Sequence, residues 1–424
     1  MSLYTLHQNL RVVTAGKGVS APLDILVKEG VIAEIGPGIQ APTPETAVHQ
    51  HNGAFASITW MDLGVYVCDP GYEHREDVHS AAAAAAAGGF GALVTMPNTL
   101  PAVHSKSEIT YLKSKSAGLP VAFYPLGAIS NDCAGKDIAE LYDMHTAGAV
   151  AFTDGASAIQ DAGLLLRAMQ YVTAFNGLII NRPHHKSIAS GGQMHEGIVS
   201  TSLGLKGIPA LSEHLMVQRD LSLLEYAGAA ARLHLHLIST AKSVEMIRAA
   251  KAAGLRVTAS VALANLCFTD QALAMEEGAS PFDSNLKTMP PIRSRADADA
   301  LIAGVNDGTI DFICTNHRPW DEEAKNLEFP YAEFGMTGLE TAYPMYNMFL
   351  AKHISTERFV DAIAVQPRQL LGLPVPALEQ GAPARFTIFH PETEWTLTTG
   401  QVQSKSLNTP LLGKPLKGRA YLVG

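Results

Sequence analysis

The feature that most constrains the fold is a series of eight short apolar, β-rich segments that alternate with helical patterns through the middle of the chain. Strands that are apolar on both faces and alternate with helices pair in parallel, and right-handed crossovers close eight of them into a ring. The sequence therefore predicts an α/β fold, a (β/α)8 TIM barrel. The eight segments are ITWMDLGVY (58–66), GALVTMPN (91–98), VAFYPLGAIS (121–130), AVAFTDG (149–155), GLIINRP (177–183), RLHLHLIS (232–239), RVTASVAL (256–263) and TIDFICTN (309–316).

The two ends of the chain differ from the middle, because they hold short strand-like runs and no long helical period. The first fifty residues include LRVVTAG and LDILVKEGVIAEIGPGI, and the last fifty include PARFTIFHP, EWTLTT and KGRAYLVG. Such β-branched runs between glycines are typical of strands. We expect a small β-sandwich formed from both termini, with residues 1–52 and 377–424 flanking a barrel of residues 53–376. Two separate ragged ends remain the alternative.

Composition excludes several classes of protein. A net charge of −9 with no lysine- or arginine-rich run argues against a nucleic-acid or anionic-membrane partner. No segment reaches the roughly 18 apolar residues of a membrane span, and the N-terminus lacks the pattern of a signal peptide. The four cysteines are scattered without a CxxC zinc motif. We therefore expect a cytoplasmic protein with reduced thiols.

The ends of the eight strands carry the chemistry of a barrel enzyme, and here the sequence is similar to a known family. The stretch DLGVYVCDPG (62–71) resembles the first-strand signature of dihydroorotases, D-x-H-V-H-x-R-x-P-G. Further landmarks follow in the same order over nearly the whole chain. They are MPNT (96–99), AFTDG (151–155), GGQMHEG (191–197), GLKGIPALSE (204–213), KTMPPIR (287–293) and TNHRPW (315–320).

The resemblance implies a metal-dependent hydrolase of the amidohydrolase superfamily. Members of the family interconvert carbamoyl aspartate and dihydroorotate in pyrimidine synthesis. In such enzymes one or two zinc ions activate a water molecule and polarise the amide carbonyl. An aspartate on the eighth strand transfers the proton.

The metal-ligand positions of the family are largely replaced in this chain. The two histidines of the first strand fall on Gly64 and Tyr66, and the histidine of the fifth falls on Arg182. The histidine of the sixth strand falls on Leu237, or on His236 if the strand has a local bulge. Glycine and leucine supply no ligand atom, and tyrosine is not among the usual ligands of zinc.

A guanidinium at the metal site also repels a cation. At a separation of roughly 4 Å and an effective dielectric of about 20, a divalent ion and a guanidinium repel by about 8 kcal/mol. Asp154 matches a carboxylate that binds metal in one group of dihydroorotases. We expect Arg182 to pair with Asp154 and so fill the vacant site with an ion pair.

The substrate and proton-transfer positions have changed as well. The family's general base falls on Asn316, and its substrate-binding arginine falls on Cys68. An amide cannot accept and return a proton, and losing a general base costs about 10²–10⁴ in rate. Met289 and Trp320 replace further polar positions of the pocket. Asn98 is retained, either beside the substrate or as a cap of the loop after the second strand.

The favoured interpretation is a dihydroorotase homologue without catalytic or metal-binding residues. Some non-catalytic homologues in this family assemble with aspartate carbamoyltransferase, so the resemblance implies that enzyme as the partner. A homodimer is expected because dimers are usual in the family. No zinc or other cofactor is expected.

The alternative is an active dihydroorotase, or another cyclic-amide hydrolase, with relocated metal ligands. Two or three histidines near the strand ends could bind a metal together with Asp154. The candidates are His184, His185, His234, His236 and His317.

Overall fold

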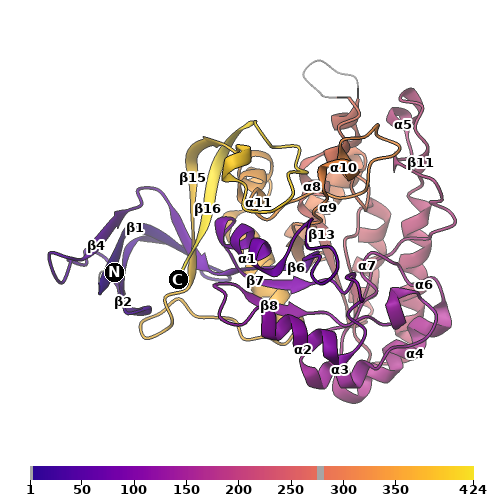
Figure 1. Ribbon diagram of the computed structural model, residues 1–424, viewed down its shortest axis with the longest axis horizontal. Helices are drawn as coiled ribbons and strands as arrows, with labels where there is room; N and C mark the ends of the chain where they lie inside the picture. Colours follow the sequence, from indigo (N-terminus) through magenta and orange to yellow (C-terminus); the bar gives the residue numbers. More distant parts are fainter. Residues whose placement is uncertain (1–2, 275–280) are drawn as a thin grey trace.

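The chain is an α/β protein in which a ring of parallel strands, covered by helices, carries a sheet made from both termini (Figure 1). The computed structural model describes residues 3–274 and 281–424. The helices that follow the first strands of the ring lie on its outside, and the strands of the N-terminal part extend away from it (Figure 1).

Hydrogen bonds join the eight predicted runs edge to edge. Two groups of parallel strands are β6–β7–β8 and β9–β12–β13–β14. Phe152 of the fourth run links them through single bridges to Gly127 and Ile179. The backbone N–H of Tyr66 donates to the carbonyl of His317 at 3.1 Å, which returns the last strand to the first. The strands are β6 (Trp60–Val65), β7 (Phe90–Thr95), β8 (Ala122–Pro125), β9 (Ile179–Asn181), β12 (Leu233–Leu235), β13 (Val257–Ala262) and β14 (Phe312–Cys314).

Several helices begin at residues whose side chains accept the first free backbone N–H groups. Asp77 caps α1 with a capping box, Ser105 and Glu108 form the box of α2, and Thr240 caps α7. The principal helices are α1 (Val78–Ala87), α2 (Lys106–Lys115), α3 (Leu141–Ala147), α4 (Ala162–Val172), α6 (Leu211–Ala227), α7 (Ala241–Ala252) and α9 (Arg295–Asn306). Shorter elements are α5 (Ile198–Ser202), α8 (Leu263–Cys267), α10 (Glu322–Lys325), α11 (Ala342–Met345), α12 (Thr356–Val360) and α13 (Gln366–Leu370).

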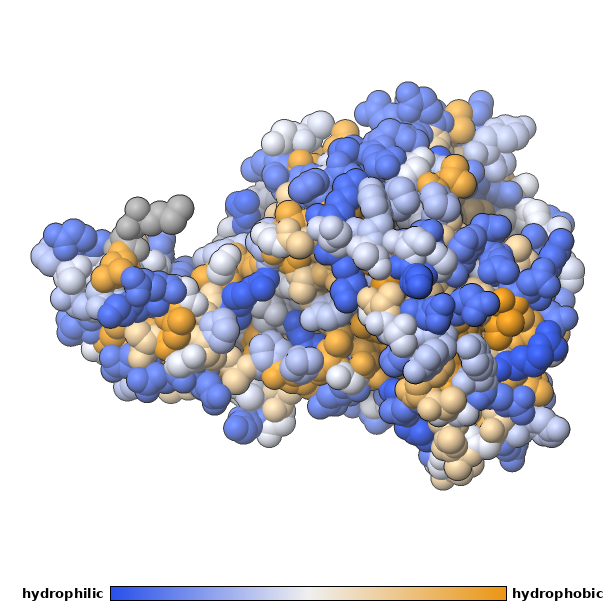
Figure 2. Space-filling view, turned by 60° about the horizontal axis from the view of Figure 1, so that its bottom comes forward, coloured by the Kyte–Doolittle hydropathy of each residue, from blue (hydrophilic) through white to orange (hydrophobic). Residues whose placement is uncertain are grey.

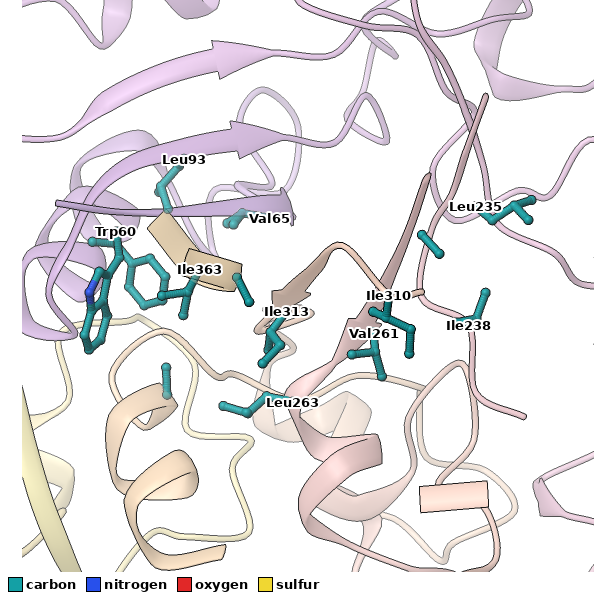
Figure 3. Packing of buried hydrophobic residues seen from close by; sticks show 14 of the residues in the cluster. Trp60, Val65, Leu93, Leu235, Ile238, Val261, Leu263, Ile310, Ile313 and Ile363 are labelled. Carbon is teal, nitrogen blue, oxygen red and sulfur yellow. The ribbon is translucent and has the colours of Figure 1, made fainter. Parts of the chain in front are cut away.

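Apolar side chains fill the space between the ring and the helices. Val65, Leu93, Val261 and Ile313 come from different strands of the ring and belong to one buried cluster (Figure 3). Trp60, which is 0% exposed, lies at one end of this cluster close to Ile363 (Figure 3). Their burial is the main stabilising contribution to the barrel.

The terminal sheet takes strands from both ends of the chain, in the order β16-β15-β5-β1-β2-β3, with β4 paired to β1. Residues 55–58 therefore belong to this sheet, although they fall within the range expected for the barrel. Because β15 pairs directly with β5, the two ends are not separate. The strands are β1 (Tyr4–Thr14), β2 (Gly18–Lys28), β3 (Val31–Gly36), β4 (Ala47–Gln50), β5 (Phe55–Ile58), β15 (Phe386–Thr396) and β16 (Pro415–Val423).

The segment between β15 and β16 returns to the barrel. Ser404 Oγ donates to the carboxylate of Glu76, and Asn408 Nδ2 donates to the carbonyl of Arg318 at 3.1 Å. The C-terminal part thus contacts the strand ends as well as the sheet.

The outer surface is mixed in polarity. The face drawn in Figure 2 is largely hydrophilic, with smaller apolar areas between the polar ones. Over the ranges that the structure describes, none of the helices combines the length and apolarity needed to cross a membrane.

Candidate functional site

The mouth of the barrel, where the strands end, brings Gly64 and His236 into direct contact. Gly64 has a φ of +99°, and a Cβ added there would lie 2.6 Å from His236 Nε2 and 2.9 Å from Met96 Cε. The imidazole of His236 therefore occupies the space in which a side chain at position 64 would begin. A histidine at Gly64, as in the family signature, does not fit beside His236 in this arrangement.

His236 is fully enclosed and neutral. Its Nδ1 lies 3.0 Å from Ser260 Oγ, and its Nε2 has no hydrogen-bond partner among the described residues. Burial, reinforced by the nearby charge of Arg182, lowers the pKa of His236 to about 3. Leu237 adopts a left-handed backbone with φ +59°, and its side chain packs in the interior apolar cluster. His236 thus contacts the first strand at Gly64, whereas Leu237 packs in an apolar cluster that also includes Leu63 and Tyr66 of the first strand run.

The predicted ion pair between Arg182 and Asp154 is wrong. Asp154 accepts hydrogen bonds from the backbone N–H of Ser130, at 2.9 Å, and from its hydroxyl. The guanidinium of Arg182 donates instead to the carbonyl of Ala156. The loop after Asp154 supplies that carbonyl, and Ser130 binds the carboxylate, so the two side chains have different partners.

Arg182 is buried with little compensation. Its side chain lines a cavity of about 520 Å³, and the residue is 8% exposed. Within the described ranges, Nε of Arg182 has no hydrogen-bond acceptor. Burial lowers the pKa of Arg182 from its ordinary value, and the charge of Arg318 lowers it further. A buried guanidinium without a carboxylate is costly unless another acceptor is supplied.

A second, smaller cavity of about 200 Å³ adjoins the first strand. Arg318 lies over the ring of Tyr66, with Cζ 5.1 Å from its centroid, and 5.5 Å from the Trp320 ring. Arg75 covers the Trp320 ring at 4.1 Å. The position of the family's substrate arginine, Cys68, also lines this cavity. Burial, with a smaller contribution from the negative charge of Glu76, raises the pKa of the Cys68 thiol to about 12, so the thiol stays protonated.

The two amides of the site are committed to backbone groups. Asn98 Nδ2 donates to the Asp154 carbonyl at 3.0 Å, and its Oδ1 accepts from Ala156 N at 2.9 Å. Asn98 thus secures the loop after the fourth strand position, not the loop after the second. Asn316 Nδ2 donates to the Met289 carbonyl at 3.3 Å. Asn316 has φ +55°, a left-handed conformation that asparagine tolerates better than most residues.

The remaining histidines of the strand ends have other partners. His234 is held by Thr258 Oγ1 and Ser260 Oγ and stacks on Phe312 at 4.7 Å. His317 Nδ1 accepts from a backbone N–H, so its Nε2 carries the proton and donates to Glu76 at 3.3 Å. His184 lines the larger cavity, and His185 Nδ1 lies 3.2 Å from Ser187 Oγ. The set of relocated ligands is therefore not brought together.

The donor set does not fit zinc. Where the family places imidazoles, the mouth offers a glycine, a phenol, a guanidinium and a leucine, with His236 as a lone ring. In the part of the chain described by the structure, no three histidine, cysteine, aspartate or glutamate side chains are placed to hold one metal ion. Zinc sites in proteins ordinarily use three or four such ligands.

Glu76 is a site residue that the sequence did not single out. It is 0% exposed, and its carboxylate accepts from Ser80, Ser404 and His317. Its only sequence signal is its place in the acidic segment after the first-strand signature.

Known proteins similar to this chain include dihydroorotases in sequence and hydantoinases in structure. A family model described as dihydro-orotase-like matches residues 57–243. The dihydroorotase of Pelotomaculum thermopropionicum is 39% identical over 405 residues, covering 95% of this chain and 92% of the relative. The dihydroorotase of Carboxydothermus hydrogenoformans is 38% identical over 416 residues, covering 97% of this chain and 94% of the relative. An L-hydantoinase (dihydropyrimidinase) from Arthrobacter aurescens has a TM-score of 0.81 at 24% identity, with 98% of this chain and 93% of that chain covered.

Proposed function

Because the chain belongs to the dihydroorotase family of the amidohydrolase superfamily, we propose that it is a non-catalytic member of that family. The observation that carries the proposal is the guanidinium of Arg182, buried at the ligand position of the fifth strand. A divalent ion beside it is opposed by charge, and the neighbouring positions Gly64 and Leu237 supply no ligand atom.

The proton-transfer position supports the same proposal. Asn316 stands where the family has its general base, and its amide donates to a backbone carbonyl. An amide in this place neither takes a proton from water nor returns one to a leaving nitrogen. Both halves of the family's reaction, water activation and proton transfer, thus lack their usual groups.

We further propose that the protein acts as a structural or regulatory partner of aspartate carbamoyltransferase. The support is indirect: the barrel framework is retained while the site is emptied, and some non-catalytic homologues in the family assemble with that enzyme. An intact scaffold without its chemistry is expected when the fold itself is used. A homodimer belongs to the same proposal.

Metal analysis and turnover test the proposal together. The purified full chain, dialysed against zinc and then against buffer, should retain far less than one zinc per chain and should not hydrolyse dihydroorotate above background. Co-expression with aspartate carbamoyltransferase should yield a complex that remains together in size-exclusion chromatography. Stoichiometric zinc with dihydroorotate turnover would overturn the non-catalytic assignment, and separate elution of the two proteins would overturn the partnership.

The second candidate function is an active cyclic-amide hydrolase with relocated ligands. One observation favours it: among the described residues, His236 Nε2 is buried beside Gly64 without a hydrogen-bond partner. The lone pair of such a nitrogen is a common metal ligand. Under this alternative, His236→Ala abolishes zinc binding and turnover together. The control His353→Ala, at an exposed position, leaves both unchanged.

A further inference from the structure

Two arginines lie side by side at the end of the barrel opposite the mouth. Leu233 of β12 pairs with Val257 of β13 in parallel register, so the residues that precede them, Arg232 and Arg256, are neighbours where the two strands begin. Like charges held close together repel each other. The fold therefore gathers positive charge at this end of the barrel.

A cavity of about 260 Å³ adjoins the two guanidiniums. Its lining includes residues that begin or directly precede β9, β12, β13 and β14, which places it at the N-terminal ends of these strands. Leu178 and Leu370 give it apolar walls, and Gln369 adds an amide. Arg232 is half-buried and Arg256 is exposed, so a ligand can reach both from solvent.

The carboxylate at this cavity is already paired. Asp311 belongs to the lining, but its carboxylate accepts from Lys251 Nζ at 2.7 Å and from the backbone N–H of Ala259 at 2.7 Å. No other acidic side chain lines the cavity in the ranges that the structure describes. The charges of Arg232 and Arg256 are therefore left without a partner of opposite sign.

Within the described part of the chain, the two guanidiniums bind backbone carbonyls alone. Arg232 donates to the carbonyls of Asn176, at 3.1 Å, and of Leu370, and Arg256 donates to the carbonyl of Ala230 at 3.1 Å. A guanidinium has five N–H donors, so most of them remain for another acceptor. Burial lowers the pKa of Arg232, and the charge of Arg256 lowers it further. An anion in the cavity supplies both the acceptor atoms and the opposite charge.

We propose that this cavity binds a phosphate group, as the free ion or on a small ester, held between Arg232 and Arg256. A phosphate has several oxygens and a charge of about −1.5 to −2 near neutral pH, so two planar guanidinium forks can bind it at once. The volume is below the roughly 300–1,000 Å³ of sites for drug-sized ligands. It suits one small anion better than a nucleotide.

This inference goes beyond the proposed function and does not depend on it. The cavity and the mouth lie at opposite ends of the strands, and the two arginines take part in neither metal binding nor proton transfer. Phosphate binding is measured without any turnover. Its result is therefore distinct from the zinc content of the chain, from hydrolysis of dihydroorotate and from assembly with a partner.

Isothermal titration calorimetry of the purified full chain tests the proposal. The probes are inorganic phosphate, glycerol 3-phosphate and acetate at the same low ionic strength, because salt screens exposed charges. At least one of the two phosphate compounds should bind saturably at one site per chain, and acetate about tenfold or more weakly. Tighter binding of inorganic phosphate identifies the free ion as the ligand, and tighter binding of glycerol 3-phosphate identifies an ester. Equal binding of acetate, or no saturable binding of either phosphate compound, would overturn the proposal.

Variants locate the site. Arg232→Gln and Arg256→Gln should each weaken phosphate binding about tenfold or more, as expected when a charge-assisted hydrogen bond is lost. Arg11→Gln is the matched control, because Arg11 is an exposed arginine on β1 of the terminal sheet. Circular dichroism reports whether each variant is folded, and if Arg232→Gln does not fold, Arg256→Gln alone decides. Unchanged affinity in a folded cavity variant, or an equal loss in Arg11→Gln, contradicts the assignment.

Discussion

At the scale of single residues, the barrel mouth combines a position without a side chain and a buried charge. Gly64 leaves the space that the His236 ring fills, while Arg182 places a buried guanidinium at the end of the fifth strand run. Any side chain introduced at position 64 therefore collides with the ring of His236.

The contact between Gly64 and His236 makes Gly64→Ala destabilising. Its added Cβ meets the imidazole at 2.6 Å, and such overpacking costs about 1–3 kcal/mol beyond the backbone strain of a positive φ. The control Gly254→Ala has φ +83° with open space around it, so it should cost only the strain, about 1–2 kcal/mol. Urea denaturation measures both.

A double-mutant cycle checks the cause. Adding His236→Ala to Gly64→Ala should recover most of the extra loss, because the colliding ring is gone. If the two substitutions are additive, the collision is not what destabilises Gly64→Ala.

Glu76 should be essential to the packing of the barrel mouth. In Glu76→Gln, one of the two acceptor oxygens becomes an NH₂ group, which cannot accept from the N–H of His317 or from the two serine hydroxyls. We therefore expect the free energy of unfolding to fall by about 1–3 kcal/mol. Thermal denaturation measures the loss. The exposed Glu323→Gln is the control and should be neutral, and an equal effect of both variants would contradict this role.

At the scale of elements, the apolar pattern of the sequence correctly located the strands, because the side chains that a strand buries are its own residues. The fourth run is the exception, since AVAFTDG makes isolated bridges at Phe152 and a few further backbone hydrogen bonds but forms no continuous strand. Its neighbours in space, Gly127 and Ile179, lie some distance along the chain, so its pairing depends on tertiary packing. The terminal sheet shows the same dependence, because β5 joins strands from both ends.

The terminal sheet contains a row of histidines that should make stability depend on pH. His7 Nδ1 lies 3.0 Å from His51 Nε2, and His51 Nδ1 lies 3.4 Å from His390 Nε2. Burial first, then neighbouring histidines, lowers the pKa of His7 to about 3 and that of His51 to about 4. The unfolded chain takes up these protons near pH 6.5, before the folded chain does. Stability should therefore fall as the pH drops from about 6.5 towards 4.

Guanidinium denaturation at pH 7.5 and pH 5 measures this effect. The loss should be on the order of 1–2 kcal/mol for each buried histidine at pH 5. His51→Gln should reduce the dependence on pH, whereas His353→Gln, at an exposed position, should leave it unchanged. An identical pH dependence in the wild type and in His51→Gln would refute the assignment to the histidine row.

At the scale of the whole molecule, the C-terminal strands of the sheet share the core of the barrel. The ring centroid of Phe389 in β15 lies 5.5 Å from that of Trp60 and 5.1 Å from that of Tyr343. Thr387 Oγ1 donates a hydrogen bond to the Gly89 carbonyl at 2.6 Å. The C-terminal strands thus close one end of the barrel core. We expect the two parts to unfold together.

Phe389→Ala tests this coupling. Removing a fully buried phenylalanine costs about 3–5 kcal/mol, and the cost should appear in the barrel as well as in the sheet. Tryptophan fluorescence and far-ultraviolet circular dichroism should give one coincident transition at lower denaturant. The control Tyr331→Ala, at a position 75% exposed, should have little effect. Two separated transitions in Phe389→Ala would show that the sheet unfolds independently.

The sequence by itself determined where the strands lie along the chain, because the apolar pattern of a strand is a property of its own residues. It could not decide the partners of the charged groups at the mouth. Arg182 was expected to pair with Asp154, but Ser130 and the carbonyl of Ala156 take those places. Only the tertiary structure sets such contacts, because a buried hydrogen bond forms with whichever donor or acceptor the folded backbone brings within about 3 Å.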